Sequence, residues 1–404
     1  MNAAPLRILH VIPNLTHNGV FTFVYSYYHG INRDKVQFDF LYDGDEDSEL
    51  RGQVEALGGR CYKLPGGNGP SFLWSAMMFG ITKLWRYRVV HVHKLGGGLF
   101  FPFLSFICGV RMRIFHAHST KFEANGTSFL KRMFYRIMVP VACFFSTDYW
   151  GCSNEAGTVV FGKTRWMRFG FLVRNAINPD KFRFDEMLRE RFRREIGVSN
   201  ETIVVVHIGN LYPPKNPAFL IDVFAAYHRR NKESILVSCG KNMQHFVVEA
   251  AIMRNKVADA VKLLGVRHDI SCVLSGADVL LFPSIFEGLP MTVVEAQANG
   301  LPIVASTAVP DVAVFNPNVQ LLDLRSSTLE KWADAVERHA AMAHLSAEVS
   351  ACRVRDSKYD ISRAAQEVQS RYLRVALASA VCNGGDRQKE DSWCAKRSSA
   401  ELTE

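Results

Sequence analysis

The sequence predicts an α/β protein with two domains, each built on a doubly wound parallel sheet. Short apolar runs of strand length alternate with segments of helical length, an order typical of parallel sheets covered by helices. The pattern restarts near residue 201, which gives two halves of about 180 residues, a usual domain size. The chain has 404 residues, too many for one ordinary core. We therefore expect Rossmann-like domains over residues 1–178 and 179–360, joined in a polar stretch around Pro179.

The elements of the first domain follow this alternating order. The stretch "FTFVYSYYHGI", residues 21–31, has helical length and one apolar stripe. "LGGGLFFPFLSFICGV", residues 95–110, is shorter than the roughly 18–20 uncharged residues of a membrane span, so we expect a buried helix after a loop. Strands are expected at five apolar runs, residues 7–12, 36–42, 87–93, 112–119 and 147–153.

The second domain repeats the same logic. "PAFLIDVFAAYHRRN", residues 217–231, predicts a helix, and Asp360 is placed to cap a final helix over 361–381. The last residues, 382–404, have few apolar side chains and no periodicity, which predicts a disordered tail. Strands are expected at six apolar runs, residues 201–210, 234–240, 260–265, 278–284, 301–306 and 319–324.

The cysteines and the N-terminal residues indicate in which compartment the protein would be found. The nine cysteines form no C-x-x-C pair, and most lie in apolar runs, so free buried thiols in a reducing compartment are expected. Arg7 interrupts the short N-terminal apolar run and no cleavage pattern follows, which indicates a cytoplasmic chain without a signal peptide.

The net charge is +9, and part of the excess lies between residues 111 and 136, where six basic residues face one acid. Large apolar residues interleave with these charges as far as Phe145. This composition suits either a solvated helix face or a peripheral contact with an anionic membrane surface. No nucleic-acid-binding motif accompanies it, so no nucleic-acid partner is expected.

"GTVVFGKT", residues 157–164, matches the phosphate-loop pattern G-x-x-x-x-G-K-[ST] letter for letter. A phosphate loop leaves a strand and opens a helix, whereas here Ser153 is placed to cap a short helix ahead of the motif. The residues from Thr164 onward then read as a return to strand. Val159, Val160 and Phe161 are also too bulky for a phosphate cradle. We interpret the match as accidental, with Gly162 ending the helix.

The segment "FPSIFEGLPMTVVEAQANGLPIVAS", residues 282–306, carries the clearest chemical signal. An apolar strand delivers the chain to Glu287, Gly288, Leu289 and Pro290, and a helix follows from there. Helix starts at the carboxyl edge of an open α/β sheet accept anions. Glu287 and Glu295 flank this helix start and could grip the hydroxyl groups of a sugar and a ribose; on spacing alone they could equally be two solvated glutamates.

This segment resembles the E-x7-E motif of the family-4 retaining glycosyltransferases, whose GT-B fold has two Rossmann-like domains facing a cleft. The resemblance extends over roughly residues 7–375. It includes "RILHVIPNLTHNG", "YRVVHVH", "RIFHAHST", "TDYWGCSNEAG", "VRNAINPDKF", "VVHIGNLYPPKNPAFLIDVF" and "LLGVRHDISCVLSGADVLLFPS". Within the family it is similar to enzymes that build capsule, exopolysaccharide or O-antigen chains. It also implies that the C-terminal helix packs back toward the first domain.

For the second domain, the resemblance implies a nucleotide-sugar site. Glu287 would contact the donor sugar, with the backbone from Gly288 through Leu289 and Pro290 to Met291 near the sugar and diphosphate. Glu295 would bind the ribose. Lys215 matches the family's phosphate-binding lysine. Val266 and Arg267 fall in the loop that borders the nucleobase.

For the first domain, His118 matches the family's active-site histidine, and Gly19 lies in the loop that approaches the phosphates. Two positions depart from the family pattern. Asn210 stands where an arginine usually follows the glycine after the first strand of the second domain. The glycine loop reads Asn18-Gly19-Val20-Phe21 in place of a double glycine. Both departures are expected to weaken diphosphate binding.

Two patterns suggest metals. His91, His93, His116 and His118 alternate at strand ends and could form a metal cluster, but such histidines are more often hydrogen-bonded core or cleft residues. "DGDEDSE", residues 43–49, lacks the glycine and the glutamate that a calcium loop requires. The expectation is therefore no metal and no cofactor beyond the nucleotide-sugar substrate.

Taken with the resemblance, these features predict a metal-independent glycosyltransferase of surface polysaccharide synthesis. It would move a sugar, with retention, from a nucleotide-sugar donor to a glycan, with a lipid-linked acceptor favoured. The alternative is a non-catalytic GT-B subunit that binds a nucleotide sugar or a partner enzyme. Asn210 and the altered glycine loop favour that alternative, whereas Glu287, Glu295, Lys215 and His118 argue against it.

Overall fold

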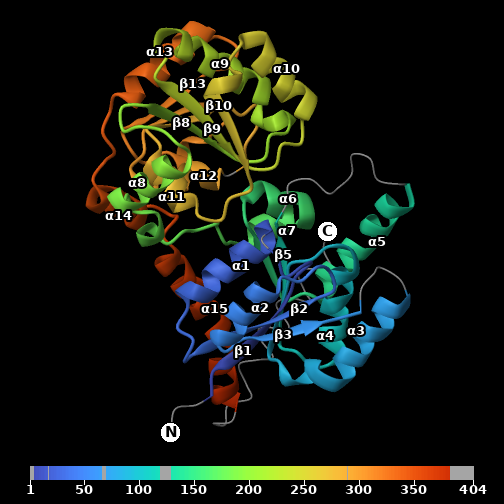
Figure 1. Cartoon of the computed structure of the whole chain (residues 1–404). Helices are drawn as coiled ribbons and strands as arrows, with labels where there is room; N and C mark the ends of the chain where they lie inside the picture. Colours follow the sequence, from blue (N-terminus) through green and yellow to red (C-terminus); the bar gives the residue numbers. More distant parts are fainter. Residues whose placement is uncertain (1–3, 17, 66–69, 119–128, 289, 383–404) are drawn as a thin grey trace. The chain divides into compact units, whose positions relative to one another are not determined.

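In the computed structural model, which describes residues 4–16, 18–65, 70–118, 129–288 and 290–382, the chain forms two compact units (Figure 1). Unit 1 comprises residues 1–174 and 361–404, and unit 2 comprises residues 175–360. The chain thus leaves unit 1 close to the predicted join and returns to it at the predicted final helix, α15 (Ile361–Cys382).

Unit 1 is built on a seven-stranded parallel sheet with the strand order β3-β2-β1-β4-β5-β6-β7. The order reverses at β1, as in a doubly wound fold. The strands are β1 (Leu6–Val11), β2 (Val36–Tyr42), β3 (Arg60–Lys63), β4 (Val89–Val92), β5 (Met112–Ala117), β6 (Asp148–Gly151) and β7 (Gly170–Leu172).

Helices cover both faces of this sheet, and the side chains of strand β4 point alternately toward the two faces. Val90 and Val92 face a core formed with α3 and α4, whereas the alternating His91 and His93 face the opposite side. On that side α1 and α15 pack against each other, and Tyr372 of α15 stacks on Trp150. The helices are α1 (Gly19–Gly30), α2 (Ser48–Ala56), α3 (Pro70–Lys83), α4 (Phe101–Ile107), α5 (Phe129–Phe145), α6 (Asn154–Phe161) and α7 (Lys163–Phe169), with 3-10 turns η1 (Leu84–Arg86) and η2 (Gly96–Phe100).

Unit 2 contains a six-stranded parallel sheet with the order β10-β9-β8-β11-β12-β13. Its central strands are buried on both faces, which explains their continuous runs of Val, Ile and Leu. The strands are β8 (Ile203–Ile208), β9 (Ser234–Cys239), β10 (Val261–Gly265), β11 (Val279–Phe282), β12 (Ile303–Ser306) and β13 (Val319–Leu322).

One face of the unit 2 sheet packs on α9, α10 and α13, and the other on α8, α11, α12 and α14. The helices are α8 (Glu186–Glu195), α9 (Pro217–Arg230), α10 (His245–Asn255), α11 (Ile270–Gly276), α12 (Met291–Asn299), α13 (Leu329–Ala340) and α14 (Ala347–Asp356). Short 3-10 turns are η3 (Pro179–Phe182), η4 (Pro213–Lys215), η5 (Ala258–Ala260) and η6 (Asp311–Ala313).

The phosphate-loop match at 157–164 lies on a helix, as predicted. Ser153 caps α6 by accepting a hydrogen bond from the Ala156 N–H at 3.1 Å, and Gly162 ends the helix with φ +80°. The expected return to strand after Thr164 is wrong, because Lys163–Phe169 forms α7 and the strand is confined to β7. The reason is Trp166, whose indole is buried against Gly157 and which anchors this second helix.

Several expectations fall partly outside the described residues. The tail at 383–404 and residues 119–128 of the basic stretch belong to this part of the chain. The seven cysteines whose side chains are described, from Cys61 to Cys352, are free thiols. No helix within the described ranges is long and apolar enough to cross a bilayer.

Candidate functional site

The loop between β11 and α12 forms the centre of the candidate site in unit 2. Pro290 is the N-cap of α12, one position ahead of the first helical residue, Met291. No side chain caps this helix start. The Ile285 N–H donates to the Pro214 carbonyl at 2.7 Å, which ties the loop to the turn that carries Lys215. The chain therefore presents an uncapped helix start next to a lysine-bearing turn, an arrangement that favours an anion.

Lys215 and Glu287 meet at this loop. The Lys215 ammonium lies 2.7 Å from a Glu287 carboxylate oxygen and 4.3 Å from the centre of the Phe282 ring. Both side chains are about nine-tenths shielded from solvent, with 12% and 9% exposure. Gly209 follows β8 with φ +148°, and a side chain there would lie 3.5 Å from the Lys215 stem. That distance is an ordinary van der Waals contact, so the positive φ, and not a lack of space beside Lys215, favours glycine at this position.

The backbone next to the Lys215–Glu287 pair is accessible at Gly288. Gly288 is exposed, and a methyl group added there would meet no neighbouring atom within 4 Å. Met291 is half-buried and packs on the unit 2 core, while Pro290 is buried. The predicted site residue Leu289 lies outside the described residues.

Glu295 lies just over one turn into α12, and its side chain is half-buried. Within the described part of the chain, no hydrogen bond or ion pair involves its carboxylate. Burial raises the pKa of Glu295 to about 7, with Lys181 opposing the shift. A carboxylate held without a partner at the carboxyl edge of a sheet can accept hydrogen bonds from a ligand's hydroxyl groups.

The remaining predicted residues of unit 2 line the same edge of the sheet. Asn210 is exposed, and its side-chain oxygen accepts a hydrogen bond from the Lys241 N–H at 2.9 Å. Val266 follows β10 and is 51% exposed. The Arg267 guanidinium is held by Asp269 at 2.7 and 2.9 Å and by Glu195 at 3.0 Å. Val266 therefore offers an apolar surface to a ligand, whereas the Arg267 charge is engaged within the protein.

Gly19 and His118 belong to unit 1. Gly19 is exposed at the start of α1, where the Asn18 side chain already accepts hydrogen bonds from the Val20 and Phe21 N–H groups at 3.1 and 3.0 Å. His118 follows β5 and is half-buried, with its Nε2 2.7 Å from the Nδ1 of His93. Burial lowers the pKa of His118 to about 3, so its imidazole is neutral.

Sequence reasoning did not identify Gly240 and His10. Gly240 follows β9 with φ +143°, and a side chain there would collide with the Gly209 carbonyl oxygen at 2.2 Å. A glycine at the end of β10, at 265, and one directly after each of β8 and β9, at 209 and 240, were the available signal. His10 is buried on β1 and belongs to the histidine cluster of unit 1, and no motif marks it.

Several known proteins are similar to this chain in sequence or in fold. Residues 202–341 match the family model described as glycosyl transferases group 1. The chain is 26% identical to the glycosyltransferase EpsF of Bacillus subtilis, covering 84% of this chain and 89% of EpsF. It is 24% identical to the UDP-Gal:alpha-D-GlcNAc-diphosphoundecaprenol alpha-1,3-galactosyltransferase of Escherichia coli, over 57% of this chain and 60% of that enzyme.

Among solved structures, the Anabaena protein HepE in complex with UDP-glucose matches with a TM-score of 0.70 and 18% identity. The match covers 91% of this chain and 99% of HepE. It shows that the two units have the fold expected from the sequence.

Proposed function

We propose that this chain is a GT-B glycosyltransferase of the group 1 type, and that it transfers a sugar from a nucleotide-sugar donor to a glycan with retention of configuration. The resemblance to capsule, exopolysaccharide and O-antigen enzymes supports a role in surface polysaccharide synthesis. The E. coli relative acts on a diphosphoundecaprenol-linked acceptor, which supports a lipid-linked acceptor here as well.

One observation carries the proposal: a buried lysine–glutamate pair, a helix start without a side-chain cap and an unpartnered carboxylate lie at the carboxyl edge of the unit 2 sheet. Lys215 and the start of α12 supply positive charge for a diphosphate. Glu287 can accept hydrogen bonds from the hydroxyls of the transferred sugar, and Glu295 from those of the ribose. These groups match the parts of a nucleotide sugar in their chemistry.

The same groups account for the chemistry. During transfer, the bond between the anomeric carbon and the diphosphate oxygen breaks, and negative charge develops on the departing nucleoside diphosphate. A fixed ammonium and helix N–H groups stabilise that charge without reorganisation, an effect worth roughly 3–4 kcal/mol per well-placed donor. On this proposal the donor site needs no divalent cation, and activity would not require added Mg²⁺ or Mn²⁺. The neutral imidazole of His118 would hydrogen-bond the reacting sugar.

Ligand-observed NMR with a panel of UDP-, GDP- and ADP-sugars tests the donor site. The wild type, Glu295→Ala and the control Glu249→Ala would be compared; Glu249 is an exposed carboxylate on α10. We expect one donor to bind the wild type and the control and to lose most of its signal in Glu295→Ala. Equal binding to all three proteins would refute the site. Donor binding without turnover on any acceptor would favour the non-catalytic alternative.

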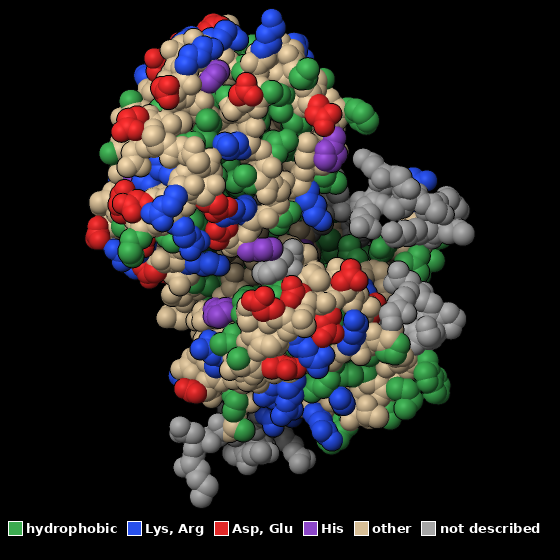
Figure 2. Space-filling view, viewed as in Figure 1, with side chains coloured by type: hydrophobic (Ala, Val, Ile, Leu, Met, Phe, Trp, Pro, Cys, Tyr) green, Lys and Arg blue, Asp and Glu red, His purple; other side chains and the backbone are tan. Residues whose placement is uncertain are grey.

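We also propose that unit 1 rests on an anionic lipid bilayer at the cytoplasmic face, where a lipid-linked acceptor would be found. Large apolar side chains are exposed along α3, η1, α4 and α5 (Figure 2). They include Trp74 (66%), Ile81 (68%), Trp85 (59%), Ile107 (63%) and Phe144 (76%). Such contiguous apolar exposure marks an interaction surface.

The charge next to these helices supports an anionic lipid surface as the partner. A pocket of about 760 Å³ beside η1 is lined by six cations and one acid. The cations are Arg7, Lys35, Arg60, Lys83, Arg86 and Arg88, and the acid is Asp34. Exposed tryptophans together with basic side chains are typical of the headgroup region of anionic membranes. The proposed lipid-binding surface includes α3 and η1, which lie outside the basic and apolar stretch that the sequence indicated. It also includes the exposed side chains of α5, which belongs to that stretch.

Co-sedimentation with vesicles tests this surface. The full chain should sediment with vesicles containing phosphatidylglycerol and remain in solution with phosphatidylcholine alone. Trp74→Ser combined with Trp85→Ser should lower the bound fraction severalfold, whereas the control Phe246→Ser, at an 89% exposed position in unit 2, should not. Equal sedimentation of both variants would contradict the assignment.

A further inference from the structure

Five histidines lie on one face of the unit 1 sheet, and the strand register explains why. His10 of β1 pairs with His91 of β4, so both side chains point to the same side. His93 lies two positions after His91, and His116 and His118 lie two and four positions after Ile114, the β5 partner of His91. Phe23 of α1 and Tyr372 of α15 cover this face.

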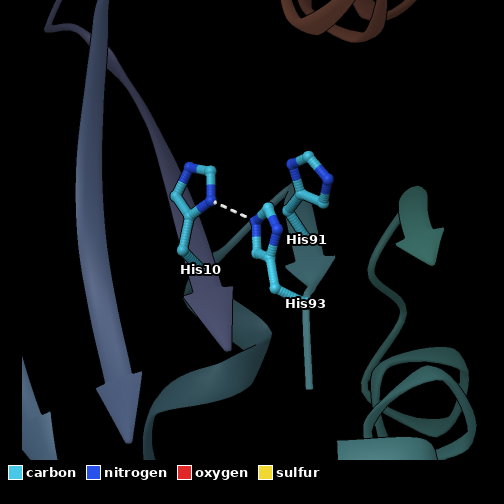
Figure 3. A group of neighbouring side chains, drawn as sticks. All are labelled: His10, His91 and His93. Carbon is cyan, nitrogen blue, oxygen red and sulfur yellow. Dashed lines mark hydrogen bonds between the residues drawn. The ribbon is translucent and has the colours of Figure 1, made fainter. Parts of the chain in front are cut away.

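Three of these histidines converge on a small internal cavity. Figure 3 shows His10 from β1 turned toward His93, with His91 beside it on β4. One ring nitrogen from each lies within 4.8 Å of the others. The cavity measures about 10 Å³, and its lining includes all three rings and Tyr372 but neither His116 nor His118. A space of this size holds one water molecule or one ion.

We propose that His10, His91 and His93 bind a single transition-metal ion of the zinc class inside unit 1. This inference goes beyond the proposed glycosyl transfer and does not depend on it, because all three ligands lie in the core of unit 1. The ion would be structural and would tie β1 to β4 beneath α1 and α15. It leaves the donor site in unit 2 without a metal.

The donor set fits such an ion chemically. His10, His91 and His93 are each 5% exposed or less, and burial favours the neutral form of an imidazole. Neutral imidazole is the ligand form that zinc, cobalt, nickel and copper bind. The absence of carboxylates from the three-histidine group disfavours Mg²⁺ and Ca²⁺, which take oxygen ligands.

The second layer of hydrogen bonds also fits. A metal-bound histidine usually donates its other ring N–H to a neighbour. If His93 binds through Nε2, its Nδ1 lies 2.7 Å from His118 Nε2. Whichever nitrogen His91 uses, the other has a partner: the Tyr372 hydroxyl is 2.7 Å from Nδ1, and His116 Nδ1 is 3.0 Å from Nε2. His10 would bind through Nδ1, and its Nε2 has no partner among the described residues, so the second layer is complete for His91 and His93 only.

Only a small movement separates the observed geometry from a metal site. His10 Nδ1 and His93 Nε2 are 2.9 Å apart, a hydrogen-bond distance. Two nitrogens on a tetrahedral zinc are about 3.3–3.4 Å apart, given zinc–nitrogen bonds of about 2.0–2.1 Å. The two rings therefore have to separate by about half an ångström. The Tyr372 hydroxyl borders the cavity and can serve a fourth ligand position directly or through water.

Cobalt(II) titration of the tag-free, full-length protein, stripped of metal, tests the proposal. We expect one cobalt per chain, with the visible absorption of a tetrahedral site, and its displacement by zinc. His10→Asn and His93→Asn should weaken binding at least 10-fold. The control His207→Asn, which changes a buried neutral histidine of unit 2, should bind cobalt as the wild type does.

X-ray absorption of the zinc-loaded wild type keeps the test independent of variants that fail to fold. Scattering from three imidazole rings would support the site. A wild type that binds no cobalt would overturn the proposal and leave the cavity to a buried water. Cobalt binding of equal strength in His10→Asn, His93→Asn and the control would overturn it too, because the ion would then lie elsewhere.

Discussion

At the scale of single residues, the Lys215–Glu287 pair is central to the proposed donor site. Both side chains are largely shielded from water, so each depends on the other or on a ligand for its charge. We expect Lys215→Ala to lower kcat/KM by about 100-fold, because a fixed cation facing the leaving diphosphate is lost. Steady-state kinetics would measure this, with Lys241→Ala, an exposed neighbouring lysine, as the control. Comparable losses in both variants would contradict a specific role for Lys215.

Glu295 gives the donor site a pH dependence. In the ligand-free protein its pKa is raised to about 7, and only the ionised form accepts hydrogen bonds from two hydroxyl groups. Donor affinity should therefore rise as pH increases toward 7, by up to about tenfold per pH unit below the pKa, and level off above it. Isothermal titration calorimetry from pH 5.5 to 8.5, in roughly half-unit steps, would follow this. Glu295→Gln should bind more weakly and lose the slope; an unchanged slope would assign the proton to another group.

These residues also show what a sequence can indicate at this scale. The spacing of Glu287 and Glu295, and the place of Lys215 in the resemblance, led to the prediction of a donor site. The structure brings Lys215 and Glu287 together, and their role in binding the donor stays a prediction. The ion pair itself joins residues 72 positions apart, so no local pattern predicts it. His10 was missed for a similar reason, because its partners come from another strand and only the register brings them together.

At the scale of elements, the residues that match the phosphate-loop pattern belong to α6 and α7, where Gly157 packs against Trp166. A methyl group on Gly157 would lie 2.2 Å from the Trp166 ring, so the glycine is required by the indole. We expect Gly157→Ala to lower the free energy of unfolding by about 1–3 kcal/mol through overpacking. Lys163→Ala, at an exposed position of the same pattern, should change neither stability nor activity. Chemical denaturation and a transfer assay would measure both, and a loss of activity in Lys163→Ala would restore a phosphate-binding role.

The strands that the sequence predicted are those with a clear run of apolar residues. Residues 36–42 and 203–208 form strands because they are long, apolar and buried. Strand β3 was not predicted because it contains no apolar run, and its two ends, Arg60 and Lys63, are exposed on the sheet edge. Helix α7 was read as a strand because its helical state depends on how Trp166 packs, which composition does not reveal.

At the scale of the whole molecule, unit 2 is an insertion within unit 1. Tyr372 of α15 is buried, stacks on Trp150 and bonds to His91, so unit 1 needs a helix that follows unit 2 in the chain. A chain ending at Asp360 should keep the cooperative unfolding of unit 2 and lose that of unit 1. Differential scanning calorimetry and limited proteolysis would separate the two, and an intact unit 1 transition in the truncated chain would contradict this dependence.

The same insertion sets an order of events during translation. The ribosome must synthesise residues 175–360 after strands β1, β4 and β5 have emerged and before α15 is available to cover them. At about 5–20 residues per second, that interval lasts on the order of 10–40 s. Throughout it, the histidine face of the nascent unit 1 is bare of one of its two covering helices. An ion that could not pass between packed helices in the finished protein has this interval to reach His10, His91 and His93, and the same opening offers a chaperone its binding surface.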